Sequence, residues 1–244
     1  MTHSTRDLEY EAPPTLSTAI IDYVKTAILR GDYPPGSSLP EIPLAKKVSA
    51  SRATIREALR GLNDLGLVDL HPRKGAMVAS LSPKRAREIY SLRAVLEPFA
   101  IRLALTEGQV RKKELATIER AFDDLRMAVG NPFALIEADM AFHWSLCAPC
   151  GHELVLEQLK HLQVRTRQFI FYTKYYDSDA EGEIEAHLPI LTALQALDPY
   201  RAESALRDHI TNAGERLLVH MSQQPLTRSS IKHIDDDGNQ SSPS

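Results

Sequence analysis

The sequence has few cysteines and no long apolar segment. Its 244 residues include only Cys147 and Cys150, too few for a disulfide framework. No apolar run approaches the ~18–20 residues that a membrane-spanning helix needs. The first residues, MTHSTRDLEYEAPP, are polar and acidic rather than signal-like. We therefore expect a cytoplasmic protein without a membrane partner.

The chain as a whole is slightly acidic, with a net charge of −3, but positive charge is concentrated in one segment. Between residues 46 and 74, seven basic residues accompany only three acidic ones. A basic patch of this kind attracts a polyanion even when it belongs to an acidic protein. Nucleic acid is therefore the first partner to consider.

The chain is long enough for two compact domains. We predict a flexible arm over residues 1–14, a first domain over 15–81, an all-helical domain over 82–221 and a disordered tail over 222–244. The second domain begins at Ser82-Pro83, where a capping residue precedes a proline suited to the first helical position. After it, apolar periodicity and its breaks predict about six helices.

The first domain has the element order of a winged helix-turn-helix. Its predicted elements are three helices and then two strands, over residues 16–30, 42–48, 53–66, 67–70 and 76–81. Ser51 is placed to cap the third helix, and residues 71–75 form the turn of the wing. The predicted fold class is mainly α, with an N-terminal winged helix-turn-helix and a C-terminal helical bundle.

The N-terminal end of the third helix and the tip of the wing carry the candidate DNA contacts. Hydroxyls and helix amides suit phosphate oxygens, and arginine binds phosphate or guanine. The candidate residues are Ser51, Arg52, Thr54, Arg56, Arg73, Lys74 and Gly75. Charge alone is equally compatible with a solvated basic helix in an unrelated three-helix module, but the element order and the wing favour DNA binding.

Residues 49–79, SASRATIREALRGLNDLGLVDLHPRKGAMVA, resemble the DNA-binding domain of the GntR superfamily of bacterial transcription regulators. The resemblance covers about residues 15–80, including the preceding GDYPPGSSL. It implies that DNA is contacted by the four residues at the start of the third helix and by Lys74 and Gly75 of the wing. The chain departs from many relatives at residues 40–43, where Pro-Glu-Ile-Pro replaces an arginine that would contact phosphate.

Four ionisable residues of the second domain share helical faces with apolar neighbours. Asp139 and His143 are four residues apart in 138-ADMAFHWSL-146, and His187 and His209 follow downstream on apolar stripes. Burying a carboxylate is costly unless something neutralises it. One divalent cation would satisfy all four groups, as in metal sites built inside helical bundles. The alternatives are ordinary buried histidines and a simple Asp139–His143 ion pair.

This domain resembles the FadR-like ligand-binding (FCD) domain, in the variant that often carries a metal. The shared pattern is D-x-x-x-H followed by two distant histidines, with Ala186 where an acid usually precedes the third ligand. The resemblance implies Zn²⁺, with Ni²⁺ or Mn²⁺ as alternatives, and a homodimer. It also gives Arg93 a role in binding a small carboxylate effector.

The other predicted residues of the effector site are less specific. Glu97, four residues after Arg93, would orient the guanidinium, although such a pair is also an ordinary helix salt bridge. Asn212, one turn beyond His209, is a further candidate. The C-x-x-C of Cys147 and Cys150 lies at a predicted helix end without a second pair, so we interpret it as structural.

These features predict a ligand-responsive transcription regulator, with repression the favoured direction of control. It would bind double-stranded operator DNA as a homodimer and would not be an enzyme. A metal-dependent hydrolase with an accessory DNA-binding module is the alternative, with Glu183 or Glu185 as the general base that it would need. A third possibility is an architectural DNA-binding protein whose bundle serves only dimerisation.

Overall fold

The computed structural model describes residues 15–173 and 180–223 of the chain. The predicted arm over residues 1–14 lies outside the described residues, as do residues 224–244 of the predicted tail. The first two residues of that predicted tail, Ser222 and Gln223, belong instead to the last helix. Among the described residues, no helix is both long and apolar enough to cross a membrane.

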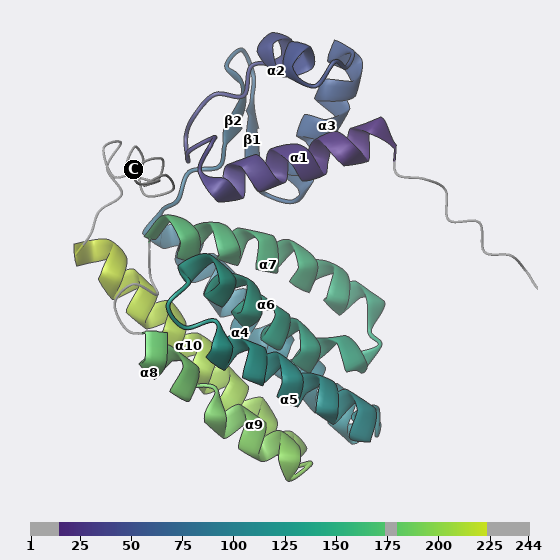
Figure 1. Cartoon of the computed structure of the whole chain (residues 1–244), viewed down its shortest axis with the longest axis vertical. Helices are drawn as coiled ribbons and strands as arrows, with labels where there is room; N and C mark the ends of the chain where they lie inside the picture. Colours follow the sequence, from purple (N-terminus) through teal and green to yellow (C-terminus); the bar gives the residue numbers. More distant parts are fainter. Residues whose placement is uncertain (1–14, 174–179, 224–244) are drawn as a thin grey trace, which may run out of the picture.

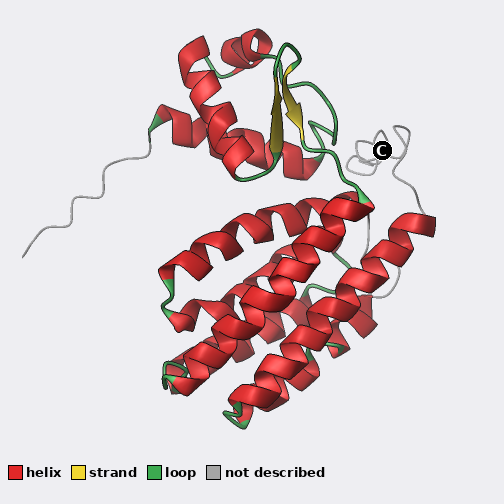
Figure 2. Cartoon of the chain, turned by 180° about the vertical axis from the view of Figure 1, so that it is seen from behind, coloured by secondary structure: helices red, strands yellow, loops and turns green. Residues whose placement is uncertain are grey.

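The N-terminal domain contains three helices and a two-stranded wing, as predicted (Figures 1 and 2). The elements are α1 (Leu16–Arg30), α2 (Glu41–Lys47), α3 (Arg52–Asp64), β1 (Val68–His71) and β2 (Gly75–Val78). The Ser51 hydroxyl accepts a hydrogen bond from the Thr54 backbone N–H at 3.1 Å, so it caps α3 as the sequence indicated. The two strands pair antiparallel, from Val68 with Val78 to His71 with Gly75.

The C-terminal domain is a bundle of α-helices with one short 3-10 turn. Its elements are α4 (Pro83–Thr106), α5 (Lys112–Met127), α6 (Pro132–Cys147), η1 (Ala148–Cys150), α7 (Glu153–Thr173), α8 (Ala180–Glu185), α9 (Leu188–Gln195) and α10 (Pro199–Gln223). Ser82 caps α4 and Asn131 caps α6, each through its side-chain oxygen. The long helices α4 and α10 run side by side (Figure 2).

The described part of this domain has one helix more than the sequence predicted, because the chain breaks between α8 and α9. The predicted break near residues 178–182 lies close to the start of α8 at Ala180, and the additional break, at Ala186 and His187, was not predicted. Pro189, in the first turn of α9, explains the position. Its ring cannot follow a continuous helix, and it has no N–H for the preceding turn.

Pro98 lies inside α4, where it has no backbone N–H to donate to the carbonyl of Ala94. A guanidinium N–H of Arg207, on the adjacent α10, lies 3.4 Å from that carbonyl oxygen and donates to it. The missing helix hydrogen bond is thus replaced across the interface between α4 and α10.

The two domains contact each other through α7 and the start of α4, and α7 lies against the winged domain in Figure 1. The Tyr172 hydroxyl donates to the carbonyls of Ile28 at 3.0 Å and Tyr33 at 3.3 Å. Arg165 Nε donates to the Leu65 carbonyl at 3.0 Å. These hydrogen bonds hold the domains in one arrangement.

Candidate functional site

Four buried polar side chains of the helical domain converge on one small cavity. Asp139 and His143 stand one turn apart on α6, His187 immediately precedes α9, and His209 lies on α10. His187 Nε2 lies 3.1 Å from Asp139 Oδ1 and 3.4 Å from His143 Nε2, while His143 Nε2 is 3.9 Å from the same carboxylate oxygen. The four residues therefore lie together, although 70 positions of sequence separate the first from the last.

The cluster has donors and space that fit a single metal ion. One ring nitrogen from each of His143, His187 and His209 lies within 4.8 Å of the other two. The buried Nδ1 of His209 has no hydrogen-bond partner among the described residues. The cavity volume is about 10 Å³, close to that of one water-sized sphere. Three imidazole nitrogens and a carboxylate form a donor set suited to Zn²⁺ and similar divalent ions.

A second layer of hydrogen bonds orients two of the imidazoles. His143 Nδ1 lies 2.6 Å from Glu97 Oε2, and His187 Nδ1 lies 2.8 Å from the carbonyl oxygen of Glu183. Because each Nδ1–H donates to an oxygen, each Nε2 is turned toward the cavity. Sequence reasoning missed both contacts, since it assigned Glu97 only to Arg93. No local pattern links Glu97 to a histidine 46 residues away.

Electrostatics keep the carboxylate charged and at least one imidazole neutral. Burial opposes ionisation of Asp139, but the hydrogen bond from His187 and the neighbouring histidines outweigh it and lower the pKa of Asp139. Burial, reinforced by His187 and His143, lowers the pKa of His209 well below its usual range. A neutral imidazole and an ionised carboxylate are the forms that bind metal.

Arg93 and Glu97 form a buried ion pair beside the histidines. Arg93 Nε lies 2.5 Å from Glu97 Oε1, and both side chains are almost fully buried. Burial opposes the charge of Glu97, but Arg93 and His143 outweigh it and lower the pKa of Glu97 to about 2. Glu97 thus connects the guanidinium to the histidine cluster. Arg93 also lines the cavity.

Asn212 does not reach the cavity. Its side chain is exposed, and the cavity is lined instead by Ile210 and Ala213 from the same helix. The expectation from helical spacing was wrong here, because the inward face of α10 is narrow at this point. Asn212 lies three residues after His209 and falls on the solvent side, whereas Ala213 lies on the cavity side.

The candidate DNA-binding residues are accessible at two places on the winged domain, the start of α3 and the wing. Ser51, Arg52 and Arg56 at the start of α3 are exposed and Thr54 is half-buried, while the wing residues Arg73, Lys74 and Gly75 are all exposed. Arg73 (φ 70°) and Gly75 (φ 76°) adopt left-handed backbone conformations that form the tight turn of the wing. The start of α3 and the wing tip therefore both expose basic side chains.

Glu41 of α2 binds both arginines at the start of α3. Arg56 Nε lies 2.8 Å from Glu41 Oε1, and Arg52 Nη2 lies 3.4 Å from Oε2. The hydrogen bond from Arg56 lowers the pKa of the Glu41 carboxyl. The sequence showed Glu41 only as a departure from its relatives and gave no sign of this pairing.

Comparison with known sequences identifies the family. Residues 16–78 match the model described as bacterial regulatory proteins of the gntR family, and residues 88–212 match the FCD domain. The chain belongs to the GntR family of DNA-binding transcriptional regulators.

Relatives of this GntR regulator include proteins named as repressors. The chain is 27% identical to the regulator YdhC of Bacillus subtilis, covering 86% of this chain and 95% of the relative. It is 27% identical to a probable D-xylose utilization operon repressor of Paenarthrobacter nicotinovorans, covering 80% and 86%. It is also 28% identical to the repressor GlaR of Escherichia coli, covering 77% and 89%.

Solved structures share the fold of this GntR regulator. Escherichia coli McbR/YncC superposes with a TM-score of 0.71 at 21% identity, covering 86% of this chain and 99% of that structure. A GntR regulator from Rhodococcus gives 0.69 at 23% identity, covering 83% and 97%. The prediction of a winged helix-turn-helix joined to a helical bundle is confirmed.

The family identifies a regulator rather than an enzyme, and the site is consistent with this. A hydrolase would need a free general base, but both Glu183 carboxylate oxygens accept hydrogen bonds from Arg216, at 2.6 and 2.8 Å. Glu185 is exposed and does not line the cavity. Glu183 thus lines the cavity as one half of an ion pair with Arg216.

Cys147 and Cys150 are buried free thiols at the end of α6 and in η1. Burial raises the pKa of Cys147 well above its usual value, which makes it a poor nucleophile. His152, which follows the pair, is exposed. In this GntR regulator the pair therefore packs at a turn between helices.

Proposed function

We propose that this GntR regulator binds operator DNA as a homodimer and that a divalent metal ion in its FCD domain takes part in sensing a small organic acid. Zn²⁺ is the ion that we favour, with Ni²⁺ and Mn²⁺ as alternatives. The observation that carries the proposal is the convergence of three imidazoles and the Asp139 carboxylate around a cavity of about 10 Å³.

The residues proposed to hold the ion are Asp139, His143, His187 and His209. Glu97 and the Glu183 carbonyl keep His143 and His187 turned toward the cavity. The unpartnered Nδ1 of His209 supports the same assignment, since a buried polar atom without a partner is costly. When bound, a divalent ion would offer open positions to the oxygens of a carboxylate.

The proposed effector is a small carboxylate that engages Arg93. The cavity holds one water-sized sphere, so an organic acid requires side chains around it to move apart. Arg93 is held by Glu97, and Glu97 also binds His143. An acid that competes for the guanidinium therefore disturbs the partner of a metal ligand. A difference of about 1–3 kcal/mol between two arrangements is enough to change operator occupancy.

The proposed DNA contacts are the exposed residues of α3 and the wing. Arg52 and Arg56 would reach base edges or phosphates, and Arg73, Lys74 and Gly75 the adjacent backbone. Ser51 and Thr54 would present hydroxyls at the N-terminus of α3. One such domain reads only a short site, so a homodimer on symmetric half-sites about one helical turn apart is expected. The repressors among its relatives support repression as its direction of control.

Metal analysis tests the sensing half of the proposal. Wild-type protein purified without chelator should contain about one divalent ion per chain, and the His187→Ala and His209→Ala variants should contain little. The metal-loaded protein is then screened against organic acids by thermal shift, with the same acids added after chelation. A metal-free wild type, or acid binding that is unchanged by chelation, would contradict this proposal. Either result would leave the DNA-binding half of the proposal standing.

A further inference from the structure

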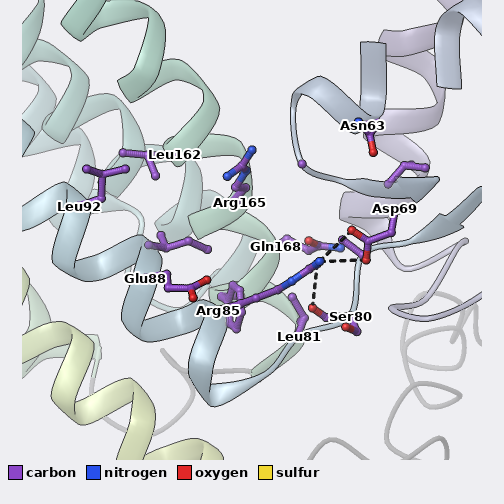
Figure 3. A pocket seen from close by; sticks show the side chains of 15 residues that line it. Asn63, Asp69, Ser80, Leu81, Arg85, Glu88, Leu92, Leu162, Arg165 and Gln168 are labelled. Atoms are coloured by element: carbon purple, nitrogen blue, oxygen red, sulfur yellow. Dashed lines mark hydrogen bonds and ion pairs between the residues drawn. The ribbon is translucent and has the colours of Figure 1, made fainter. Parts of the chain in front are cut away.

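A second cavity, of about 380 Å³, lies between the two domains and away from the histidines (Figure 3). Its volume falls within the range of small-molecule sites, about 300–1,000 Å³. The winged domain contributes Asn63, Gly66 and Asp69 to its wall, while α4 and α7 contribute the opposite side. No function described above uses this cavity.

The charges that line the cavity are paired, with one exception among the described residues. Asp69 accepts two hydrogen bonds from Arg85, at 2.8 and 3.0 Å, and Glu88 lies 3.8 Å from Lys84. Within the described chain, no carboxylate lies within 4.0 Å of the Arg165 guanidinium, which binds only the Leu65 carbonyl through Nε. Burial, together with the positive charge of Arg85, lowers the pKa of Arg165. The cavity therefore favours an anion.

A buried amide beside Arg165 also lacks a partner. Gln168 lies three residues after Arg165 on α7, lines the same cavity and is only 2% exposed. Its Nε2 has no hydrogen-bond acceptor among residues 15–173 and 180–223. An unsatisfied buried donor costs free energy that an oxygen-bearing ligand would recover. Figure 3 shows Arg165, Gln168 and Arg85 projecting into this space.

Part of the wall on the bundle side is apolar. The side chains of Ile89, Leu92, Leu162 and Phe169 line the bundle side of the cavity. A ligand that places an anionic group at Arg165 can therefore pack its body against these hydrocarbon side chains. This combination selects a molecule with one charged end and a compact apolar body.

We infer that the cavity between the domains is a second ligand site, which binds an aromatic or short aliphatic monocarboxylate. The carboxylate would accept hydrogen bonds from Arg165 and the Gln168 amide, and the apolar body would pack on Leu162 and Phe169. Because its walls belong to both domains, the bound acid holds the winged domain against α4 and α7. The site is separate from the histidine cavity and does not depend on a metal.

A fluorine-NMR titration of the full-length protein with 4-fluorobenzoate tests this inference. Wild-type protein should bind the probe saturably, and neutral 4-fluorobenzamide should bind at least tenfold more weakly. Gln168→Met, which keeps the side-chain volume, and Arg165→Gln should each weaken binding of the acid at least tenfold. Leu92→Trp, at a half-exposed position on the rim, should block the cavity while leaving both polar groups in place.

The control is the same titration in the presence of EDTA, which removes any probe held through a metal in the histidine cavity. Binding that survives EDTA and is lost in Gln168→Met and Leu92→Trp supports the site. The inference is overturned if wild-type protein does not bind 4-fluorobenzoate. It is equally overturned if binding disappears with EDTA or persists at full strength in Arg165→Gln. Circular dichroism of each variant establishes that it is folded.

Discussion

Glu97 Oε2 lies 2.6 Å from Nδ1 of His143, joining α4 to α6 inside the helical domain. The same carboxylate binds Arg93 through its other oxygen. One acidic side chain therefore connects the proposed effector residue with a proposed metal ligand. We expect measurable effects when this contact, the histidine cluster, the arginines of α3 or the domain interface is altered.

Glu97→Gln removes the charge that orients His143 while keeping the shape of the side chain. Loss of such a partner typically lowers metal affinity about 10–100-fold. The variant also leaves Arg93 buried without its counter-ion, so its free energy of unfolding should fall by about 3–5 kcal/mol. Competition with a metal-binding dye measures the affinity of the folded protein. Glu157→Gln, at an exposed position of α7, is the control, and equal affinities in the two variants would refute the role of Glu97.

Removal of the metal should destabilise the protein, because the ion binds only the folded state. A ligand at about 1,000 times its dissociation constant contributes about 4 kcal/mol. A chelator should therefore lower the thermal midpoint by roughly 8–16 °C, at about 2–4 °C per kcal/mol. The chelator should not lower the midpoint of His209→Ala. It should lower that of His161→Ala as in the wild type, because His161 lies outside the cluster. Scanning calorimetry with and without EDTA gives the answer, and a midpoint insensitive to EDTA would count against the site.

Arg56→Ala should weaken operator binding more than Arg60→Ala on the same helix. Both side chains are exposed, and both substitutions remove one positive charge. Only Arg56 lies at the end of α3 that is proposed to enter the major groove, where a lost contact costs about 1–3 kcal/mol. A DNA fragment selected from a random pool and titrated at fixed salt provides the measurement. Similar losses in the two variants would mean that α3 contributes only charge.

Glu41→Gln should raise the affinity for non-specific DNA severalfold. Glu41 accepts from Arg52 and Arg56, so it competes with phosphate for these guanidinium groups. Asp22→Asn removes an equal charge from α1 of the same domain and is the matched control. Fluorescence anisotropy at two salt concentrations separates the pairing from general repulsion. If both variants gain the same affinity for non-specific DNA, Glu41 acts only through its contribution to the net charge.

Gly66→Ala should cost more stability than Gly108→Ala, although both positions have positive φ, 72° and 66°. Each substitution carries the strain of a left-handed backbone, about 1–2 kcal/mol. At Gly66 the new methyl would also overlap the Arg165 guanidinium, whereas nothing lies within 4 Å at Gly108. The guanidinium must therefore leave the Leu65 carbonyl. Urea unfolding compares the two variants. Equal losses of unfolding free energy would show that the Arg165 side chain moves aside without a cost in stability.

Local signals predicted the fold well, because helix caps and turns depend on neighbouring residues. Ser51 and Ser82 cap the helices that follow them, as their positions indicated. The break at Ala186 and His187 was not predicted, because the apolar periodicity around it favours one continuous helix despite Pro189. Its position would have indicated the break.

The candidate site was predicted only in part, for a physical reason. Helical periodicity indicates that a side chain points inward, and Asp139 and the three histidines do so. It does not indicate which groups meet across helices. The contacts of Glu97 with His143, Arg56 with Glu41 and Arg165 with Leu65 all depend on tertiary packing.

The proline inside α4 has a mechanical consequence. Arg85, which binds Asp69 of the wing, and Pro98, beside Glu97, belong to the same continuous helix. Thirteen residues of α-helix extend about 20 Å, so a tilt of only ~3° at the proline would displace the far end of that rod by about 1 Å. Bending resistance is weakest where the backbone lacks its own hydrogen bond. A slight change in tilt beside the buried carboxylate would thus be magnified into movement at the DNA-facing domain.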